Sequence, residues 1–183
     1  MKNIALHILD IVQNSTKAGA QLVKIAIRED LAENTFLVTI EDNGCGMDAD
    51  FLQKVADPYT TTRTTRKVGM GLSLLKQNAE MTDGSFRIDS AKGRGTKVEA
   101  CFGHKHIDRP ALGDIVGVVL MLITGNPQVD FVYAHEKDGE SFVLDTREVK
   151  EALEGMALNT PEVRPMLKEL ITENLKELKV LPQ

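Results

Sequence analysis

A glycine-bearing block that directly follows a predicted strand constrains this chain more than any other feature of its sequence. Residues 36–41 (FLVTIE) predict a strand, and residues 42–47 (DNGCGM) come next without a spacer. Glycines such as Gly44 and Gly46 let a flat ring approach the backbone closely. A carboxylate at a strand end, here Asp42, can accept a hydrogen bond from the exocyclic amine that distinguishes adenine from guanine. Taken alone, the block also fits an ordinary Asp-Asn-Gly turn, so its meaning depends on other segments.

The first of these segments is a predicted helix over residues 3–18. Apolar residues recur at helical spacing from Ile4 to Val12 and would form one buried stripe. Asp10 and Asn14 stand four residues apart on this helix and therefore share a face. A carboxylate can polarise a water molecule, and an amide oxygen suits Mg²⁺, a hard ion that prefers oxygen ligands. A solvated helix face would show the same pair, so this signal also needs support from elsewhere.

A second glycine-bearing segment, residues 69–74 (GMGLSL), lies between a long predicted loop and a predicted helix over residues 72–82. Glycines before a helix N-terminus offer free N–H groups and the positive end of the helix dipole to phosphates. The loop before them includes residues 60–67 (TTTRTTRK), which suit a lid whose Arg63, Arg66 or Lys67 contacts a triphosphate. A solvated loop without a ligand is the other interpretation of this stretch.

The predicted elements follow the order helix, strand, strand, helix, loop, helix, strand, strand through residues 1–103. Helices grouped with an antiparallel sheet predict an α+β fold built as a two-layer α/β sandwich. The composition changes at residues 104–110 (HKHIDRP), whose histidines indicate either a polar linker or a metal-binding pair. Residues 104–183 then predict a helix, a hairpin and further helices. We therefore expect two domains, a sandwich over 1–103 and a small α+β C-terminal extension over 104–183.

Charge and hydropathy exclude several classes of partner. The 183 residues carry a net charge of −5, whereas duplex nucleic-acid binders usually present a basic face. The N-terminus lacks the continuous apolar stretch of a signal peptide. The most apolar stretch, residues 115–124, is far shorter than the ~20 residues that span a bilayer. We expect a cytoplasmic protein without nucleic-acid or membrane partners, with Cys45 and Cys101 as reduced thiols.

The order and spacing of four motifs resemble the GHKL superfamily of ATPases, which includes gyrase, heat-shock chaperones, histidine kinases and MutL-type mismatch-repair proteins. Residues 10–20 look like the N box of that family, and residues 42–47 match its adenine-binding box. Residues 69–74 are similar to its G-x-G-L-S-[LI] box, and residues 93–96 (GRGT) to its last motif. The resemblance covers residues 1–103 and implies the Bergerat ATP-binding fold.

The resemblance also implies ATP and Mg²⁺ as ligands and gives a role to individual positions. Asn14 would coordinate Mg²⁺, Asp42 would bind the adenine amino group, and Thr96 would assist Asp42. The other cofactor-binding positions that it implies are Lys17, Gly44, Gly46, Met47, Arg63, Lys67, Gly69, Met70, Gly71 and Leu72.

The candidate catalytic residue, Asp10, departs from the family pattern. The hydrolytic branch of the family has Glu at this position, and Asp is one methylene shorter. A misplacement of ~1 Å can cost ~10²-fold in rate. Hydrolysis assisted by Asp10 is therefore a hypothesis rather than an implication of the motif.

Three uses of bound ATP stay open. The first is a slow ATPase or an ATP-gated switch, in which an ordered lid is read by a protein partner. The second is a protein kinase acting in trans on a separate phosphoacceptor, like anti-sigma-factor kinases or detached histidine-kinase domains. The third is a nucleotide-sensing module without catalysis. A leucine-rich stripe from Leu167 to Leu178 in the extension would pack on the chain itself or form a homodimer.

Overall fold

The computed structural model describes residues 3–56 and 70–182 of the chain. Its helices are α1 (Ile4–Lys17), α2 (Ala49–Ala56), α3 (Met70–Glu80), α4 (Ile115–Gly125), α5 (Thr146–Ala152) and α6 (Val163–Glu177). Its strands are β1 (Leu22–Asp30), β2 (Thr35–Asp42), β3 (Ser85–Ala91), β4 (Gly95–Gly103), β5 (Asp130–Lys137) and β6 (Glu140–Asp145). Each predicted helix and strand of the first 103 residues is present, with boundaries that differ by a few residues.

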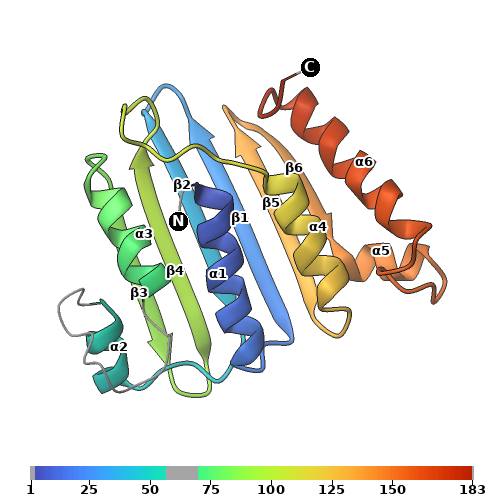
Figure 1. The fold of residues 1–183 in the computed structure, drawn as a ribbon, viewed down its shortest axis with the longest axis horizontal. Helices are drawn as coiled ribbons and strands as arrows, with labels where there is room; N and C mark the ends of the chain where they lie inside the picture. The colour runs from blue at the N-terminus through green and yellow to red at the C-terminus, as the bar shows by residue number, and fades with distance from the viewer. Residues whose placement is uncertain (1–2, 57–69, 183) are drawn as a thin grey trace.

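The described strands form one six-stranded sheet in the order β3-β4-β2-β1-β5-β6. Neighbouring strands are antiparallel except β1 and β5, which run parallel. Helices α3, α1, α4 and α6 lie side by side over one face of the sheet (Figure 1). The strands bury alternate residues against these helices, as strand geometry requires. The prediction of a two-layer α+β sandwich is confirmed.

Helix α1 begins and ends where its sequence provides capping groups. The Asn3 side chain accepts a hydrogen bond from the Leu6 N–H at 2.9 Å, which satisfies one of the free donors in the first turn. Gly19 follows the helix with a φ of +76°, a left-handed conformation that glycine adopts without a steric penalty. Between these ends the helix buries one apolar side, including Ile4 and Ile8. This side lies on the centre of the sheet.

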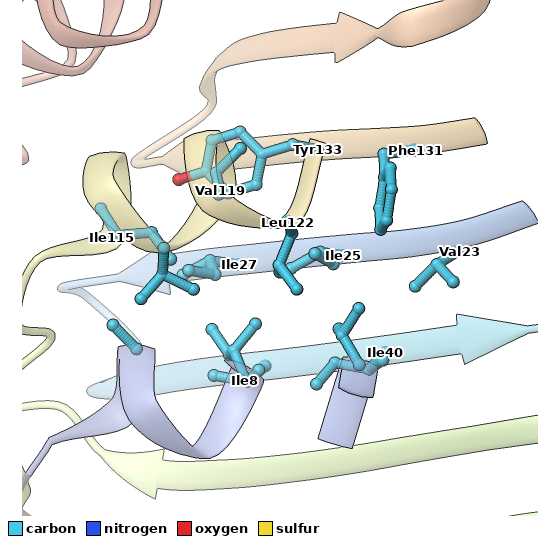
Figure 2. Close-up of a cluster of buried hydrophobic side chains, with 14 of the residues drawn as sticks. Ile8, Val23, Ile25, Ile27, Ile40, Ile115, Val119, Leu122, Phe131 and Tyr133 are labelled. Carbon is cyan, nitrogen blue, oxygen red and sulfur yellow. The ribbon is translucent and has the colours of Figure 1, made fainter. Parts of the chain in front are cut away.

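The apolar core continues from β1 into the C-terminal part of the chain. Figure 2 shows Ile25 and Ile27 of β1 beside Phe131 and Tyr133 of β5, with Leu122 of α4 packed over them. All five side chains are at most 2% exposed. Residues 104–183 thus add two strands to the sheet of the first 103 residues and share their core. The division into two domains at residue 103 stays a prediction. The sheet and the apolar core both continue across this boundary.

A buried polar cluster also joins these two parts of the chain. Glu29 of β1 has one carboxylate oxygen 2.8 Å from Nε2 of His135 in β5 and the other 2.7 Å from Nε2 of His104. The Tyr133 hydroxyl lies 2.9 Å from Nδ1 of the same His135 ring. Burial alone would raise the pKa of Glu29, but hydrogen bonds with His135 and His104 outweigh it and lower the pKa to about 2. His104, one of the two histidines in residues 104–110, is therefore part of this cluster.

The leucine-rich stripe of α6 divides between the interior and the surface. Leu167, Ile171 and Leu175 are buried, which confirms packing on the chain's own body. Leu170 remains 43% exposed. Within residues 3–56 and 70–182, the helices are too short or too polar to cross a bilayer.

Candidate functional site

Asp42, the last residue of β2, is held by donors from two directions. The Ser15 hydroxyl on α1 donates to Oδ2 of Asp42 at 2.6 Å, and the Gly44 N–H donates to Oδ1 at 2.9 Å. Ser15 is buried, whereas Asp42 is partly exposed. Each carboxylate oxygen has two lone pairs, so these two bonds leave acceptor capacity for a ligand. The carboxylate is therefore fixed in orientation and still able to bind an external donor.

Asn43 ties the glycine-bearing block to the start of β1. Its side-chain oxygen accepts hydrogen bonds from the backbone N–H groups of Gln21 at 2.8 Å and Leu22 at 2.9 Å. The Gln21 carbonyl in turn accepts from the N–H of Asp130, the first residue of β5, at 2.8 Å. Asp130 also binds Nζ of Lys150 on α5 at 2.6 Å. A continuous chain of hydrogen bonds thus runs from α5 through the start of β5 to the block.

Two glycines bring the block against the turn between β3 and β4. A Cβ atom at Gly46 would overlap the carbonyl of Ala91, and a Cβ atom at Gly95 would overlap the carbonyl of Asp42. Both glycines also have positive φ angles, +66° and +83°. Any other residue at these positions would be strained and would push the two segments apart. Gly46 and Gly95 are therefore required by the backbone, independently of any ligand.

The hydroxyl of Ser90 contacts both Thr96 and the backbone of Met47. The Ser90 hydroxyl lies 2.9 Å from that of Thr96, donates to the Gly95 carbonyl at 2.9 Å and accepts from the Met47 N–H at 2.9 Å. Thr96 stands opposite Asp42 in the pairing of β2 with β4. Its direct hydrogen bond goes to Ser90, and Asp42 receives its hydroxyl donor from Ser15 instead. The assistance of Thr96 to Asp42, directly or through water, stays a prediction.

Asp10, Asn14 and Lys17 follow one another along α1. Asp10 and Asn14 are partly exposed and Lys17 is exposed. Asn14 directly precedes Ser15, so the predicted metal ligand lies one residue from the group that holds Asp42. Mg²⁺ usually takes one or two protein oxygens and completes its shell with phosphates and waters. A partly exposed amide oxygen such as that of Asn14 suits this role.

The first turn of α3 lies next to α1. His7 of α1 has Nε2 3.0 Å from the side-chain nitrogen of Asn78 on α3. Burial lowers the pKa of His7, while the backbone of Gly71 and the carboxylate of Asp10 act to raise it. Gly71 and Leu72 belong to the first turn of α3, whose N–H groups have no acceptor within the helix. The structure thus brings the predicted phosphate-binding turn close to the helix that carries Asp10 and Asn14.

Several predicted site residues cannot be placed in this arrangement. Arg63, Lys67 and Gly69 lie outside the described residues, and so does the side chain of Met70. The lid prediction falls on the same stretch. Among residues 3–56 and 70–182, no group of three or more His, Cys, Asp or Glu side chains is arranged to hold a metal ion.

Ser15 lies within the motif at residues 10–20 without a role of its own, and Ser90 lies outside all four motifs. Ser15 and Asp42 are 27 residues apart, and Ser90 and Met47 are 43 apart. A serine on the buried side of an amphipathic helix was the available signal for Ser15, because a buried hydroxyl requires a hydrogen-bond partner.

The amino-terminal part of the chain matches a known family. The family model described as "Histidine kinase-, DNA gyrase B-, and HSP90-like ATPase" covers residues 2–106, more than half of the chain. The solved "Crystal Structure of N terminal domain of a DNA repair protein" is similar at a TM-score of 0.56 and 16% identity, covering 79% of this chain and 53% of that one. At this identity the likeness concerns the fold alone.

The similar curated proteins are much longer than this chain. The signal transduction histidine-protein kinase AtoS of Escherichia coli (strain K12) is 33% identical over 89 residues, 48% of this chain and 14% of its own length. The sensor kinase CckA of Brucella abortus (strain 2308) is 39% identical over 80 residues, 43% of this chain and 8% of its own. The non-motile and phage-resistance protein of Caulobacter vibrioides is 28% identical over 122 residues, 63% of this chain and 14% of its own. The similarity thus spans a small part of each relative.

Proposed function

Because the chain belongs to the histidine kinase-, DNA gyrase B- and HSP90-like ATPase family, we propose that it binds ATP with Mg²⁺ beside Asp42 and α1. The bound nucleotide then serves a slow ATPase or an ATP-gated switch acting on a protein partner. The observation that carries this proposal is the Asp42 carboxylate, fixed by Ser15 and the Gly44 N–H at the end of β2 and still able to accept. Acceptors held in advance bind a ligand without a further ordering cost.

In this proposal the adenine amino group donates to Asp42, and the backbone around Gly44 and Gly46 borders the ring. The close approach of Gly46 and Gly95 to neighbouring carbonyls supports a pocket whose walls are backbone rather than side chain. Specificity for adenine follows from the acceptor, because guanine presents a carbonyl oxygen where adenine presents an amine. A carbonyl facing the carboxylate would leave two acceptors in contact without a proton.

The phosphates extend along α1 towards the first turn of α3. Backbone N–H groups of Gly71 and Leu72 bind phosphate oxygens together with Gly69, and Lys17, Arg63 and Lys67 supply positive charge. Asn14 is the protein ligand of Mg²⁺, which neutralises phosphate charge when it is bound. Asp10, one turn before Asn14, orients the attacking water if hydrolysis occurs.

A second function, phosphoryl transfer in trans to a protein phosphoacceptor, is favoured by one specific observation. The curated relatives include a protein named as a histidine-protein kinase and one named as a sensor kinase. Transfer needs no hydrolytic base, so the shorter side chain of Asp10 would not impede it. The two functions share the ATP site and differ in where the γ-phosphate goes.

The test is an overnight incubation of the protein with γ-labelled ATP and Mg²⁺, followed by separation of free phosphate from protein-bound label. Asn14→Ala removes the metal ligand and should abolish any turnover, while Gln13→Ala, an exposed neighbour on the same helix, should not. Free phosphate from the wild type supports the ATPase. Nucleotide binding by calorimetry without phosphate release supports the kinase or a sensor. Absence of ATP binding altogether would refute the proposal.

A further inference from the structure

An apolar groove lies between α5 and α6. These helices lie at the β6 side of the sheet, whereas α3 and α1 of the candidate nucleotide site cover its other strands (Figure 1). Its volume is about 460 Å³. It is lined by Val149 and Ala152 of α5, by Leu153 directly after α5, and by Val163, Met166, Leu167, Glu169 and Leu170 of α6. Seven of these eight side chains are apolar, so the groove offers few groups for a polar ligand. Neither the proposed nucleotide site nor its phosphates use it.

The rim of the groove exposes large apolar side chains to solvent. Met166 is 61% exposed and Leu170 is 43% exposed. Because the two residues are four apart on α6, their side chains lie on the same side of the helix, one turn apart. A contiguous apolar edge of this kind beside a groove is typical of a surface that binds another protein segment.

Charge over the first three turns of α6 is segregated between two sides of the helix. Glu169 lines the groove, and Glu173 follows it by one turn. Glu162 precedes Met166 by one turn and lies on the same side. Arg164 and Lys168, which are both exposed, fall on the opposite side of the helix by the same spacing. The groove therefore has an acidic margin along α6.

The cations near the groove are already engaged. On α5, Arg147 pairs with Asp145 and Lys150 pairs with Asp130, each at 2.6 Å. On α6, Lys176 lies 3.3 Å from Glu173 in an exposed pair, which offsets that carboxylate only weakly.

Glu148 stands one turn before Ala152 on α5 and is exposed. Acidic side chains thus flank the apolar floor from both helices.

We propose that this groove binds a helical segment of a protein partner that carries apolar side chains on one face and Lys or Arg beside them. The apolar face would cover Met166 and Leu170, and the basic flanks would meet Glu169 and Glu173. A second copy of the chain is disfavoured as occupant, because it would bring an identical acidic margin and a net charge of −5 against the first. An anionic membrane surface is disfavoured for the same reason.

The test uses three synthetic peptides of about 18 residues, long enough to form helix on binding. The first has Leu at helical spacing with Lys on both flanks, the second replaces each Lys by Glu, and the third scrambles the first sequence. Fluorescence anisotropy with the full chain should give an affinity for the first peptide at least ~10-fold above the other two, and lower at higher salt. Equal binding of the first and scrambled peptides, or no binding of the first, would overturn the proposal.

Variants locate the binding on the protein. Met166→Glu places a charge on the apolar edge at an exposed position and should weaken the first peptide ~10-fold or more. Glu169→Lys combined with Glu173→Lys should reverse the preference towards the acidic peptide. The matched control, Arg164→Glu with Lys168→Glu, changes two exposed charges on the other side of α6 and should leave the affinity within ~2-fold. An unchanged affinity in Met166→Glu would show that the peptide binds elsewhere.

Two other occupants would appear as distinct outcomes that overturn the assignment. A dimer seen by sedimentation that Met166→Glu dissociates would assign the groove to a second copy. Saturable binding of an uncharged apolar dye that none of the peptides displaces would assign it to a small molecule, since ~460 Å³ lies in the range of ligand pockets.

Discussion

Two carboxylates at opposite ends of the β1–β2 pair show how one sheet holds both a candidate ligand site and a buried polar cluster. Asp42 ends β2 and faces Val23 at the start of β1, whereas Glu29 lies near the end of β1 and faces Phe36. Each receives two hydrogen bonds from the chain. Asp42 is partly exposed beside a block of glycines, while Glu29 is 6% exposed and bound by two imidazole rings.

The difference lies in what surrounds each carboxylate. Beyond Asp42 the pairing of β2 ends and the chain turns through the 42–47 block, which leaves one side of the carboxylate open. Around Glu29 the sheet continues on to β5, and His135 with His104 closes the remaining space. The first carboxylate can therefore contribute to binding and the second to stability. A loss of ATP affinity without a loss of stability in a Glu29 variant, or the reverse in an Asp42 variant, would break this comparison.

The largest effect is expected from Glu29→Gln. It removes the charged acceptor of two buried hydrogen bonds from His135 and His104, and hydrogen bonds to a charged group contribute about 1.5–3 kcal/mol each. Urea unfolding followed by circular dichroism at neutral pH measures this loss. The control is Glu136→Gln, a partly exposed residue 3.5 Å from Arg28 on the same sheet, which should change stability by less than ~0.5 kcal/mol. ATP affinity should stay the same in both variants, provided that they are measured where they are folded.

The stability that Glu29 contributes should also depend on pH. Its pKa is lowered to about 2 in the folded chain, below the ordinary value of 4.5. The ionised carboxylate therefore contributes its full stabilisation above about pH 4.5, and this contribution is lost as the pH falls towards 2. The difference in unfolding free energy between wild type and Glu29→Gln should shrink by about 3 kcal/mol over that window. A constant difference across the window would mean that the histidines do not favour the charged form.

Asp42→Asn should produce the converse result. Replacing the charged acceptor by an amide should weaken ATP binding by about 100-fold, or about 2.7 kcal/mol, and change folding stability far less. Calorimetric titration with Mg-ATP measures the first quantity and urea unfolding the second. Glu41→Gln is the matched control, because Glu41 precedes Asp42 on the same strand, points to the other face and pairs with Lys24 at 3.3 Å. Wild-type ATP affinity in Asp42→Asn would exclude this carboxylate from the site.

A smaller effect separates two hydroxyls that could support Asp42. Ser15→Ala removes the 2.6 Å bond to the carboxylate and should weaken ATP binding by about 10-fold. Thr96→Ala removes a bond to Ser90 instead and should cost less than ~3-fold. The same calorimetric titration compares the two. The reverse ranking would show that Thr96 acts on the bound nucleotide, through water or directly.

Local patterns in the sequence single out Asp42 as a candidate binding residue, but they do not indicate the buried environment of Glu29. Asp42 follows an alternating strand and precedes two glycines, so both its position and its exposure can be read within ten residues. Glu29 looks like an ordinary charged residue near a strand end, because its partners are 75 and 106 residues away. For the same reason, the sequence around His104 indicates only a polar linker or a metal-binding pair.

The sheet order was unpredictable for a related physical reason. Hairpins such as β1–β2 and β5–β6 can be predicted from the sequence, because a short turn separates two segments of alternating apolar and polar residues. The parallel pairing of β1 with β5 has no such turn, since the strands are separated by most of the chain. Alternation indicates that a strand buries one face, but it does not say which edge the strand will join. The extension could therefore be predicted as α+β without its place in the sheet.

The chain of hydrogen bonds from α5 through Asp130 and Gln21 to Asn43 has a thermodynamic consequence. It connects one wall of the α5–α6 groove to the segment that bears Asp42. If a bound nucleotide changes the affinity of the groove for its partner by some factor, the partner must change the affinity for nucleotide by the same factor. A single pair of titrations, each ligand with and without the other, therefore closes a cycle whose two coupling free energies have to agree.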